Sequence, residues 1–359
     1  MEGMPSIAVV GATGAVGREC LSILEARRFP HRSIRLLASA RSAGARVRFA
    51  GEERAVEELG PRSFEGIDLA FFAAGAGVAR EFVPRATAAG SIVIDKSSAF
   101  RADPWAVLAI PEVNRAALRG VARGSVVAVP NCSTIILLVA IEPLRRFGVE
   151  RVVVSTYQAA SGAGAQAMQE LEDQTRDVLA GRPATPRVFA EPCAFNVFSH
   201  DSAIDPATGL NAEEAKFTSE TRRLWGESGE GGGGGVRINA TCVRVPVMRG
   251  HSESVCLTLG RAVREVEVRA ALTAGESIEV VDERGGNRFP TPLRASGGDQ
   301  VLVGRIRADV TQGVEPGGAC RGWNLFVSGD QLRLGAALTA VKIAEELVGV
   351  ESKQSTNRT

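Results

Sequence analysis

The chain has 359 residues, more than one typical domain needs and enough for two hydrophobic cores. It carries 42 Lys and Arg against 41 Asp and Glu, so no charge excess indicates a nucleic acid or membrane partner. Six scattered cysteines lack the spacing of a metal site, and we expect reduced thiols and no metal. The N-terminus lacks the layout of a signal peptide, and the longest apolar run, residues 135–141, cannot span a membrane. We therefore predict a cytoplasmic protein.

The first predicted unit is a strand, a glycine turn and a helix. Residues 7–10 are apolar, GATGAVG follows at 11–17, and apolar positions continue at helical spacing to Phe29. Glycines in such a turn let backbone N–H groups approach a pyrophosphate at the start of the helix. A bare glycine pattern also occurs in ordinary turns, so the flanking strand and helix are what favour dinucleotide binding.

The second predicted strand, residues 33–39, ends without the acidic residue that would hold a free ribose 2′-hydroxyl. Arg41, between Ser39 and Ser42, fits a 2′-phosphate instead and favours NADP over NAD, although an exposed arginine is also typical of any solvated turn. Further strands at 67–74 and 91–97 are separated by a helical pattern. This alternation predicts a doubly wound parallel sheet.

A single cysteine follows the next apolar strand. Residues 126–129 end in Pro130, Asn131 and Cys132, where a helical pattern begins. An open helix N-terminus favours a thiolate, which makes Cys132 a candidate nucleophile. A small buried core thiol is the alternative, and this segment alone does not separate the two.

The remaining sequence predicts a second domain with a mixed sheet and helices on one face. Its predicted elements are a strand from Arg151, a glycine loop at 162–164 and a helix to Ala180, loosely patterned sequence at 182–210, a helix at 211–225, strands at 238–247 and 253–260, a helix at 265–275, and strands at 277–282 and 301–309. His251 is predicted in the turn between two of these strands. Five glycines at 231–235 predict a mobile loop, and a long helix at 332–350 precedes a polar tail from Glu351.

Several motifs occur in one order from about residue 6 to residue 349: GATGAVG, SARSAG, SSAFR, PNCSTI, QAASGAG, EEAK, RVPVMRGHSES and SGDQLRLGAALTAV. With them the sequence resembles the aspartate-β-semialdehyde dehydrogenase family. The resemblance implies a glyceraldehyde-3-phosphate-dehydrogenase-like α/β fold. A discontinuous Rossmann-type NADP-binding domain would comprise residues 1–131 and 330–359, and an α+β catalytic and dimerisation domain residues 132–329.

The resemblance also implies a reaction, the NADPH-dependent reductive dephosphorylation of L-aspartyl 4-phosphate to L-aspartate 4-semialdehyde. It would proceed through a cysteine thioester, in the biosynthesis of diaminopimelate, lysine, threonine and methionine. The family further suggests a homodimer, possibly a homotetramer, with small-molecule substrates and no nucleic acid or membrane partner.

The resemblance assigns roles residue by residue. Cys132 matches the nucleophile, His251 the proton-shuttling histidine, and Gln158 the glutamine that orients the substrate. Arg244 matches the clamp for the substrate carboxylate and Glu213 a second substrate-binding residue; Arg101, Asn131 and Lys216 match the phosphate site. The cofactor positions are Gly11, Thr13, Gly14, Ala15, Val16, Ser39, Arg41, Ser42, Ser161, Gly162 and Gln331. Gln331 implies that the last helix returns to the N-terminal domain.

The residues themselves agree with these roles. An acyl phosphate is an activated carboxyl, and a thioester splits its reduction into two easier steps. Among the three histidines, His31 lies in a surface connection and His200 in the loosely patterned segment, which leaves His251 as the best acid/base candidate. Taken alone, each charged site residue would more often be a solvated surface residue.

Two alternatives remain. N-acetyl-γ-glutamyl-phosphate reductase shares the fold, the cysteine and the chemistry, but its acetylated amine would not suit Glu213. An inactive NADP-binding homologue is the other reading, which Cys132, Gln158, Arg244 and His251 together argue against. Two departures from the family pattern, the glycine-rich loop at 226–235 and Lys96 in place of the usual asparagine, touch no assigned residue.

Overall fold

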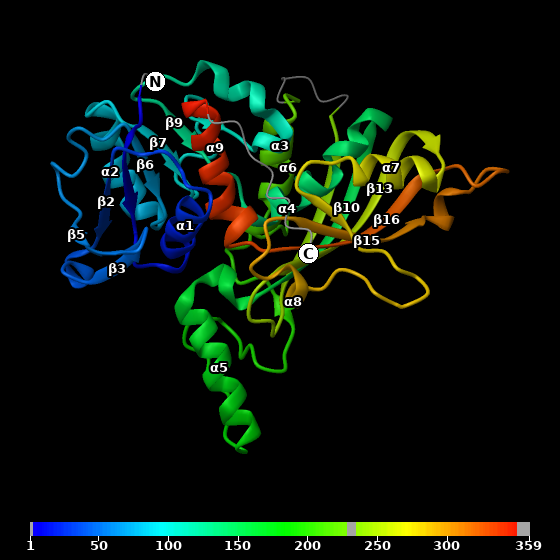
Figure 1. Ribbon diagram of the computed structural model, residues 1–359. Helices are drawn as coiled ribbons and strands as arrows, with labels where there is room; N and C mark the ends of the chain where they lie inside the picture. Colours follow the sequence, from blue (N-terminus) through cyan, green and yellow to red (C-terminus); the bar gives the residue numbers. More distant parts are fainter. Residues whose placement is uncertain (1–2, 228–234, 350–359) are drawn as a thin grey trace. The chain divides into compact units, whose positions relative to one another are not determined.

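A computed structural model of the chain describes residues 3–227 and 235–349 (Figure 1). It divides into two compact units, one made of residues 1–130 and 336–359 and the other of residues 131–335. The predicted tail from Glu351 and most of the predicted glycine loop, except Gly235, lie outside the described residues. No helix in the described ranges is long and apolar enough to cross a membrane.

The first unit is built on a seven-stranded sheet in which every neighbouring pair is parallel. Its strands, in spatial order, are β5 (Glu57–Glu58), β2 (Ser33–Ala38), β1 (Ser6–Val10), β6 (Leu69–Phe72), β7 (Ile92–Asp95), β9 (Val126–Ala128) and β8 (Val107–Leu108). Helix α1 (Ala15–Ala26) connects β1 to β2, and α2 (Ala76–Ala88) connects β6 to β7. All of β1 is buried, as expected for a central parallel strand covered on both faces. The predicted doubly wound parallel sheet is confirmed.

The end of the chain belongs to this first unit. Helix α9 (Thr339–Val348) packs against α1 and the short helix α3 (Pro111–Asn114). Arg27 Nε lies 2.7 Å from Glu345 Oε1, and Lys342 forms an ion pair with Glu112. A hairpin of β3 (Arg46–Phe49) and β4 (Glu52–Ala55) completes the unit.

The second unit contains a mixed seven-stranded sheet. Its strands, in spatial order, are β11 (Phe198–Ser199), β12 (Arg237–Arg244), β10 (Val149–Gln158), β13 (His251–Val263), β16 (Cys320–Gly329), β15 (Val301–Ala308) and β14 (Ile278–Val280). The β10–β12 and β14–β15 pairs are parallel and the others antiparallel. This bears out the predicted mixed sheet.

Helices cover one face of this sheet. Helix α4 (Cys132–Ile141) contacts β15, β16 and α6 (Ala212–Leu224); α6 contacts β12, and α7 (Glu265–Thr273) contacts β14 and β15. Alternate residues of β13 from His251 to Leu259 are buried, whereas Ser254 on the other face is exposed. Helix α5 (Ala165–Leu179) extends away from the sheet, and α8 (Pro292–Ala295) is a single turn (Figure 1).

Three sequence predictions need correction. His251 is the first residue of β13, opposite Gly329, and not part of a turn, because pairing with β16 extends the strand. Strand β16 itself was not predicted, since Trp, Asn and Gly interrupt its pattern. The predicted last helix begins as a π-helical segment, η6 (Arg333–Leu338). Gly335 lies in that segment, and a Cβ there would come within 3.0 Å of the Cys132 Cβ.

The turn between β1 and α1 depends on glycines for close packing. A Cβ on Gly17 would lie 2.1 Å from the Gly11 carbonyl oxygen. Because that oxygen is backbone and cannot rotate away, we predict that Gly17→Ala lowers the free energy of unfolding by about 1–3 kcal/mol or more.

The matched control is Gly77→Ala in α2, where an added Cβ meets nothing within 4 Å. There, alanine should be neutral or stabilising by up to about 1 kcal/mol. Urea unfolding of both variants measures the difference, and equal changes would contradict the packing argument.

Candidate active site

Cys132 is the first residue of α4, directly after the cap residue Asn131. The Asn131 Oδ1 accepts hydrogen bonds from the N–H groups of Ser133 at 3.0 Å and Thr134 at 3.3 Å. The helix N-terminus is therefore capped and not fully open, which corrects part of the sequence argument. Cys132 remains half-buried, whereas the following residues of α4 are all buried. A thiol at the only half-buried position of an apolar helix can meet a ligand.

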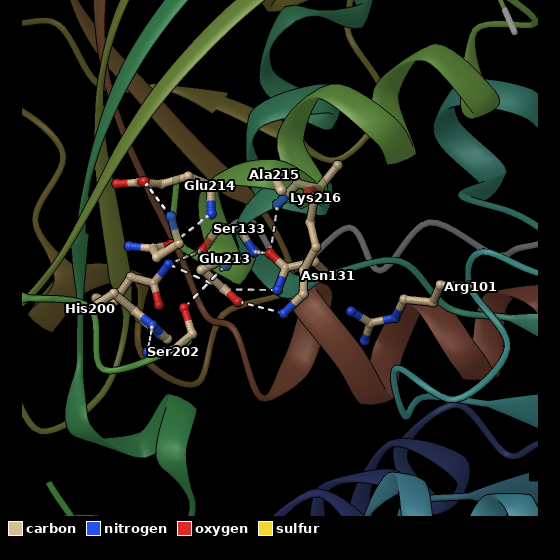
Figure 2. A network of polar contacts seen from close by, with 12 residues as sticks. Arg101, Asn131, Ser133, His200, Ser202, Glu213, Glu214, Ala215 and Lys216 are labelled. Atoms are coloured by element: carbon tan, nitrogen blue, oxygen red, sulfur yellow. Dashed lines mark hydrogen bonds and ion pairs between the residues drawn. The ribbon is translucent and has the colours of Figure 1, made fainter. Parts of the chain in front are cut away.

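The carboxylate of Glu213, in the first turn of α6, connects α6 to the start of α4 (Figure 2). Asn131 Nδ2 donates to its Oε1 at 2.8 Å, and Lys216 Nζ lies 2.7 Å from its Oε2. Burial opposes ionisation of this carboxyl, but Lys216, His200 and the hydrogen bonds from Lys216 and Asn131 outweigh it. They lower the pKa of Glu213 to about 2. The site therefore holds a permanent buried negative charge at neutral pH.

Gln158, the last residue of β10, lies between the same two helices. Its Nε2 donates to Ser133 Oγ at 2.9 Å and is 3.4 Å from Glu213 Oε1. The two chain neighbours of Cys132 are thus both hydrogen-bonded across the site. Asn131 bonds to Glu213, and Ser133 bonds to Gln158. The structure brings Gln158, Glu213, Asn131 and Lys216 together around the cysteine's helix terminus.

Arg244, the last residue of β12, is 2% exposed and held on several sides. Its Nη1 donates to the Ala159 carbonyl at 3.0 Å, and its Nη2 lies 3.0 Å from His200 Nε2 and 3.4 Å from Asp201 Oδ1. The ring of Phe189 lies 5.3 Å from the guanidinium carbon. The Nε has no hydrogen-bond partner among the residues that the structure describes. That buried donor can bind a carboxylate.

His251 is fully buried, and its hydrogen bonds define its tautomer. The Ala159 N–H donates to Nδ1 at 3.0 Å, so Nδ1 carries the lone pair and the proton of the neutral ring is on Nε2. Nε2 has no partner within the described residues. Burial first, and then Arg244, lower the pKa of His251 to about 3. The imidazole is therefore a neutral N–H donor at physiological pH.

Gly162 leaves room beside this ring. A Cβ at Gly162 would lie 3.0 Å from His251 Nε2 and 3.3 Å from Arg244 Nη1. Gln331 lies in the same part of the second unit, since its Nε2 donates to Ser161 Oγ and its Oε1 accepts from Gly250 N–H at 3.0 Å. Ser161, Gly162 and Gln331 thus surround the segment that leads into His251.

The sequence reasoning set aside His200, yet the structure places it against Arg244. It follows β11, and its side chain is 11% exposed. Its segment has no periodic pattern because buried polar residues of α5 hold it: Glu170 accepts from the Arg187 N–H at 3.0 Å, and Gln174 accepts from the Cys193 N–H at 2.8 Å. No sequence signal marks such side-chain to backbone contacts, so His200 could not be found by periodicity.

The other cofactor candidates lie in the first unit. Gly11, Thr13, Gly14, Ala15 and Val16 form the turn from β1 into α1, and Ser39, Arg41 and Ser42 lie just after β2. Gly11 has a φ of +81°, and a Cβ there would approach the Ala73 carbonyl oxygen to 2.8 Å. Gly14, the cap of α1, offers no side-chain hydrogen bond, so the first N–H groups of α1 have no capping side chain. Such a side-chain-free helix terminus fits a dinucleotide pyrophosphate.

Arg101, the remaining phosphate candidate, also belongs to the first unit. Its Nη2 donates to the Lys96 carbonyl at 2.9 Å, so the expectation that Lys96 touches no assigned residue is wrong. The residues assigned to the phosphate therefore come from both units, Arg101 from the first and Asn131 and Lys216 from the second.

The buried neutral state of His251 predicts a pH-dependent stability. Its folded pKa of about 3 lies below the ordinary 6.5, so below pH 6.5 the unfolded chain takes up the proton first and stability falls. The loss should reach up to about 1.4 kcal/mol per pH unit. His251→Asn, which keeps an acceptor for the Ala159 N–H, should lack this loss.

Urea unfolding of both proteins between pH 6.5 and 4.5 measures the effect. Buried Glu253 has a raised pKa and titrates in the opposite sense, so the quantity to compare is the difference between variant and wild type. A difference that does not change with pH would show that His251 is not buried neutral.

Comparisons with known proteins identify relatives over nearly the whole chain. The family model described as the NAD binding domain of semialdehyde dehydrogenase matches residues 6–121, and the model described as its dimerisation domain matches residues 141–334. An aspartate-semialdehyde dehydrogenase of Synechocystis is 42% identical over 349 residues, 96% of this chain and 98% of that one. The Aquifex aeolicus protein of the same name is 41% identical over 345 residues, 95% and 97% of the two chains.

Solved structures give the same answer. The crystal structure of aspartate semialdehyde dehydrogenase II from Vibrio cholerae, complexed with ASA, superposes with a TM-score of 0.88 at 38% identity. The match covers 96% of this chain and 98% of that one. Similarity at this level extends over both units. The chain belongs to the aspartate-semialdehyde dehydrogenase family.

Proposed function

We propose that the chain catalyses the NADPH-dependent reductive dephosphorylation of L-aspartyl 4-phosphate to L-aspartate 4-semialdehyde, in the biosynthesis of diaminopimelate, lysine, threonine and methionine. The observation that carries the proposal is the placement of Cys132 between Asn131 and Ser133, whose side chains bond to Glu213 and Gln158. A half-buried thiol beside a buried anion and a buried guanidinium suits a substrate with an amino acid end and a reactive carbonyl.

Cys132 is the nucleophile. Its thiolate attacks the acyl carbon of the substrate, the bond from that carbon to the phosphate oxygen breaks, and phosphate leaves a thioester on Sγ. NADPH, when bound, supplies the hydride that reduces this thioester. The carbon–sulfur bond then breaks, which releases the aldehyde and restores the thiolate. Gln158, through its contacts with Ser133 and Glu213, orients the substrate beside the thiol.

His251 donates a hydrogen bond from Nε2 to the oxygen of the reacting carbon. Negative charge develops on that oxygen at each tetrahedral stage, and a preorganised buried donor stabilises it. The Ala159 N–H on Nδ1 keeps the proton on Nε2, which supports this role in the reductive direction. In the oxidative direction, the same Nε2–H donor stabilises the oxyanion that forms when the thiolate attacks the aldehyde.

Charged side chains recognise both ends of the substrate, the amino acid end and the phosphate. Arg244 binds the α-carboxylate, because its Nε lacks a protein partner in the described residues and a guanidinium matches a carboxylate in geometry. Glu213, whose pKa is lowered to about 2, is ionised at neutral pH and attracts the α-ammonium group. Lys216, Asn131 and Arg101 bind the phosphate.

The turn from Gly11 to Val16 holds the pyrophosphate of the cofactor, and Ser39, Arg41 and Ser42 hold the 2′-phosphate. Ser161, Gly162 and Gln331 contact the nicotinamide end. Arg41 is exposed, and no acidic residue follows β2, which supports NADP over NAD. On this proposal residues 1–131 and 330–359 form the NADP-binding domain, and residues 132–329 form the catalytic and dimerisation domain.

The active form is at least a homodimer, with a homotetramer as the larger alternative. The matched dimerisation-domain model supports this, as do the exposed apolar side chains that the second unit carries beyond α5, Phe195, Val197 and Ile204 among them. A cytoplasmic location also remains a prediction from the sequence.

The test of the activity is NADPH formation from aspartate semialdehyde, NADP and phosphate, with Cys132→Ser as the variant. We expect phosphate-dependent turnover in the wild type and less than about a thousandth of it in the variant, because a hydroxyl is a far weaker nucleophile. NADP binding, followed by fluorescence titration, should be nearly unchanged.

Retention of more than about a tenth of the activity would remove Cys132 from the nucleophile role. N-acetyl-γ-glutamyl semialdehyde serves as the comparison substrate: faster turnover of that aldehyde would favour the rival reductase, and no turnover of either would indicate an inactive homologue.

Arg41 tests the cofactor assignment. We predict that Arg41→Ala raises the KM for NADPH by about tenfold or more and leaves the KM for NADH within about twofold, because only NADPH carries the 2′-phosphate. Steady-state kinetics with each cofactor give both values. Equal changes for NADPH and NADH would show that Arg41 does not contact the 2′-phosphate.

A further inference from the structure

We propose that His200 is a positioning residue that holds the Arg244 guanidinium in the orientation in which it binds the substrate carboxylate. The proposal deepens the proposed function and rests on it. It gives a role to a side chain that has none in the chemistry above, in a segment that the sequence pattern leaves undefined.

The backbone brings the two side chains together. Strand β11 pairs with β12, with Phe198 opposite Arg244, and the His200 N–H donates to the Cys242 carbonyl at 2.9 Å. The imidazole is consequently fixed at the end of the same strand that carries Arg244. Its Nε2 lies 3.0 Å from Arg244 Nη2.

The chemistry of the guanidinium decides the tautomer of His200. Arginine can only donate, so Nε2 must accept and the ring proton must be on Nδ1. The Ser202 N–H, 3.2 Å from Nδ1, competes for the single lone pair, but a charged donor makes the stronger hydrogen bond. The carboxylate of Asp201, with Oδ1 3.7 Å from Nδ1, stabilises the proton there.

The contact fixes the one end of Arg244 that the backbone does not hold. Nη1 is bound to the Ala159 carbonyl and one face of the guanidinium lies on Phe189. Nη2 meets only His200 and Asp201 among the described residues, and its contact with Asp201 is longer, at 3.4 Å. Without the imidazole, Nη2 could turn toward Asp201 and move the Nε donor away from the substrate.

Protonation would reverse the interaction. An imidazolium has no lone pair on either nitrogen, so its Nε2–H would point at the guanidinium N–H. The two positive groups would then repel each other. Glu213 and Asp201 favour the imidazolium, whereas burial, Arg244 and Lys216 disfavour it more strongly and lower the pKa of His200 below its ordinary 6.5. His200 is therefore neutral at pH 7, and its contact with Arg244 is lost only in more acidic solution.

Steady-state kinetics with semialdehyde and phosphate varied independently test the proposal at pH 7.5. We expect His200→Ala to raise the semialdehyde KM about tenfold, with the phosphate KM unchanged and kcat within about threefold, because one hydrogen bond to a charged group is lost. His200→Gln, whose amide oxygen can accept from Nη2, should restore most of the wild-type KM. His31→Ala, which removes a histidine of the first unit outside the site, is the control and should change neither constant.

The pH profile separates positioning from a purely structural role. The wild-type semialdehyde KM should rise as pH falls below 6.5, and the rise should be absent in His200→Gln. A phosphate KM that rises as much as the semialdehyde KM in His200→Ala, a glutamine variant as impaired as the alanine variant, or an acid rise that persists in His200→Gln would overturn the proposal.

A measurement independent of turnover distinguishes this inference from the proposed function. NMR titration of the His200 imidazole should show its pKa rising in Arg244→Gln, since Arg244 lowers it in the wild type. An unchanged titration would refute the contact even in an active enzyme. An inactive wild type with the expected titration shift would refute the proposed reaction and leave the contact in place.

Discussion

The buried carboxylate of Glu213 is the charge around which the second unit arranges its polar residues. A buried carboxylate is costly unless ion pairs and hydrogen bonds replace its water. Here Lys216, one turn later on the same helix, and Asn131, the cap of α4, supply them. Because Asn131 also caps the helix that begins with Cys132, the ionisation of Glu213 and the position of the thiol are physically connected.

Burial, reinforced by one shared neighbour, keeps the two histidines of the second unit neutral. Burial lowers the pKa of both His251 and His200, and Arg244 acts in the same direction. Each ring has a defined tautomer because one nitrogen accepts from a fixed donor, the Ala159 N–H for His251 and Arg244 for His200. One guanidinium thus disfavours positive charge on both adjacent imidazoles.

The sheet beneath this site carries a further buried acid without a balancing cation. Glu253 lies two residues beyond His251 on the same face of β13, and neither of its oxygens has a hydrogen-bond partner in the described residues. Burial raises its pKa well above the ordinary value, which favours the neutral carboxylic acid.

The sequence by itself determined the doubly wound sheet, the glycine turn, the mixed second sheet and the helix that starts at Cys132, because these depend on local periodicity and turn residues. Its motifs also carried the family resemblance. Only the tertiary structure decided that Asn131 caps α4 while bonding Glu213, and that His251 begins a strand. It alone placed His200 on Arg244. These features arise from pairing between strands and from hydrogen bonds between residues far apart in the chain, which no local pattern records.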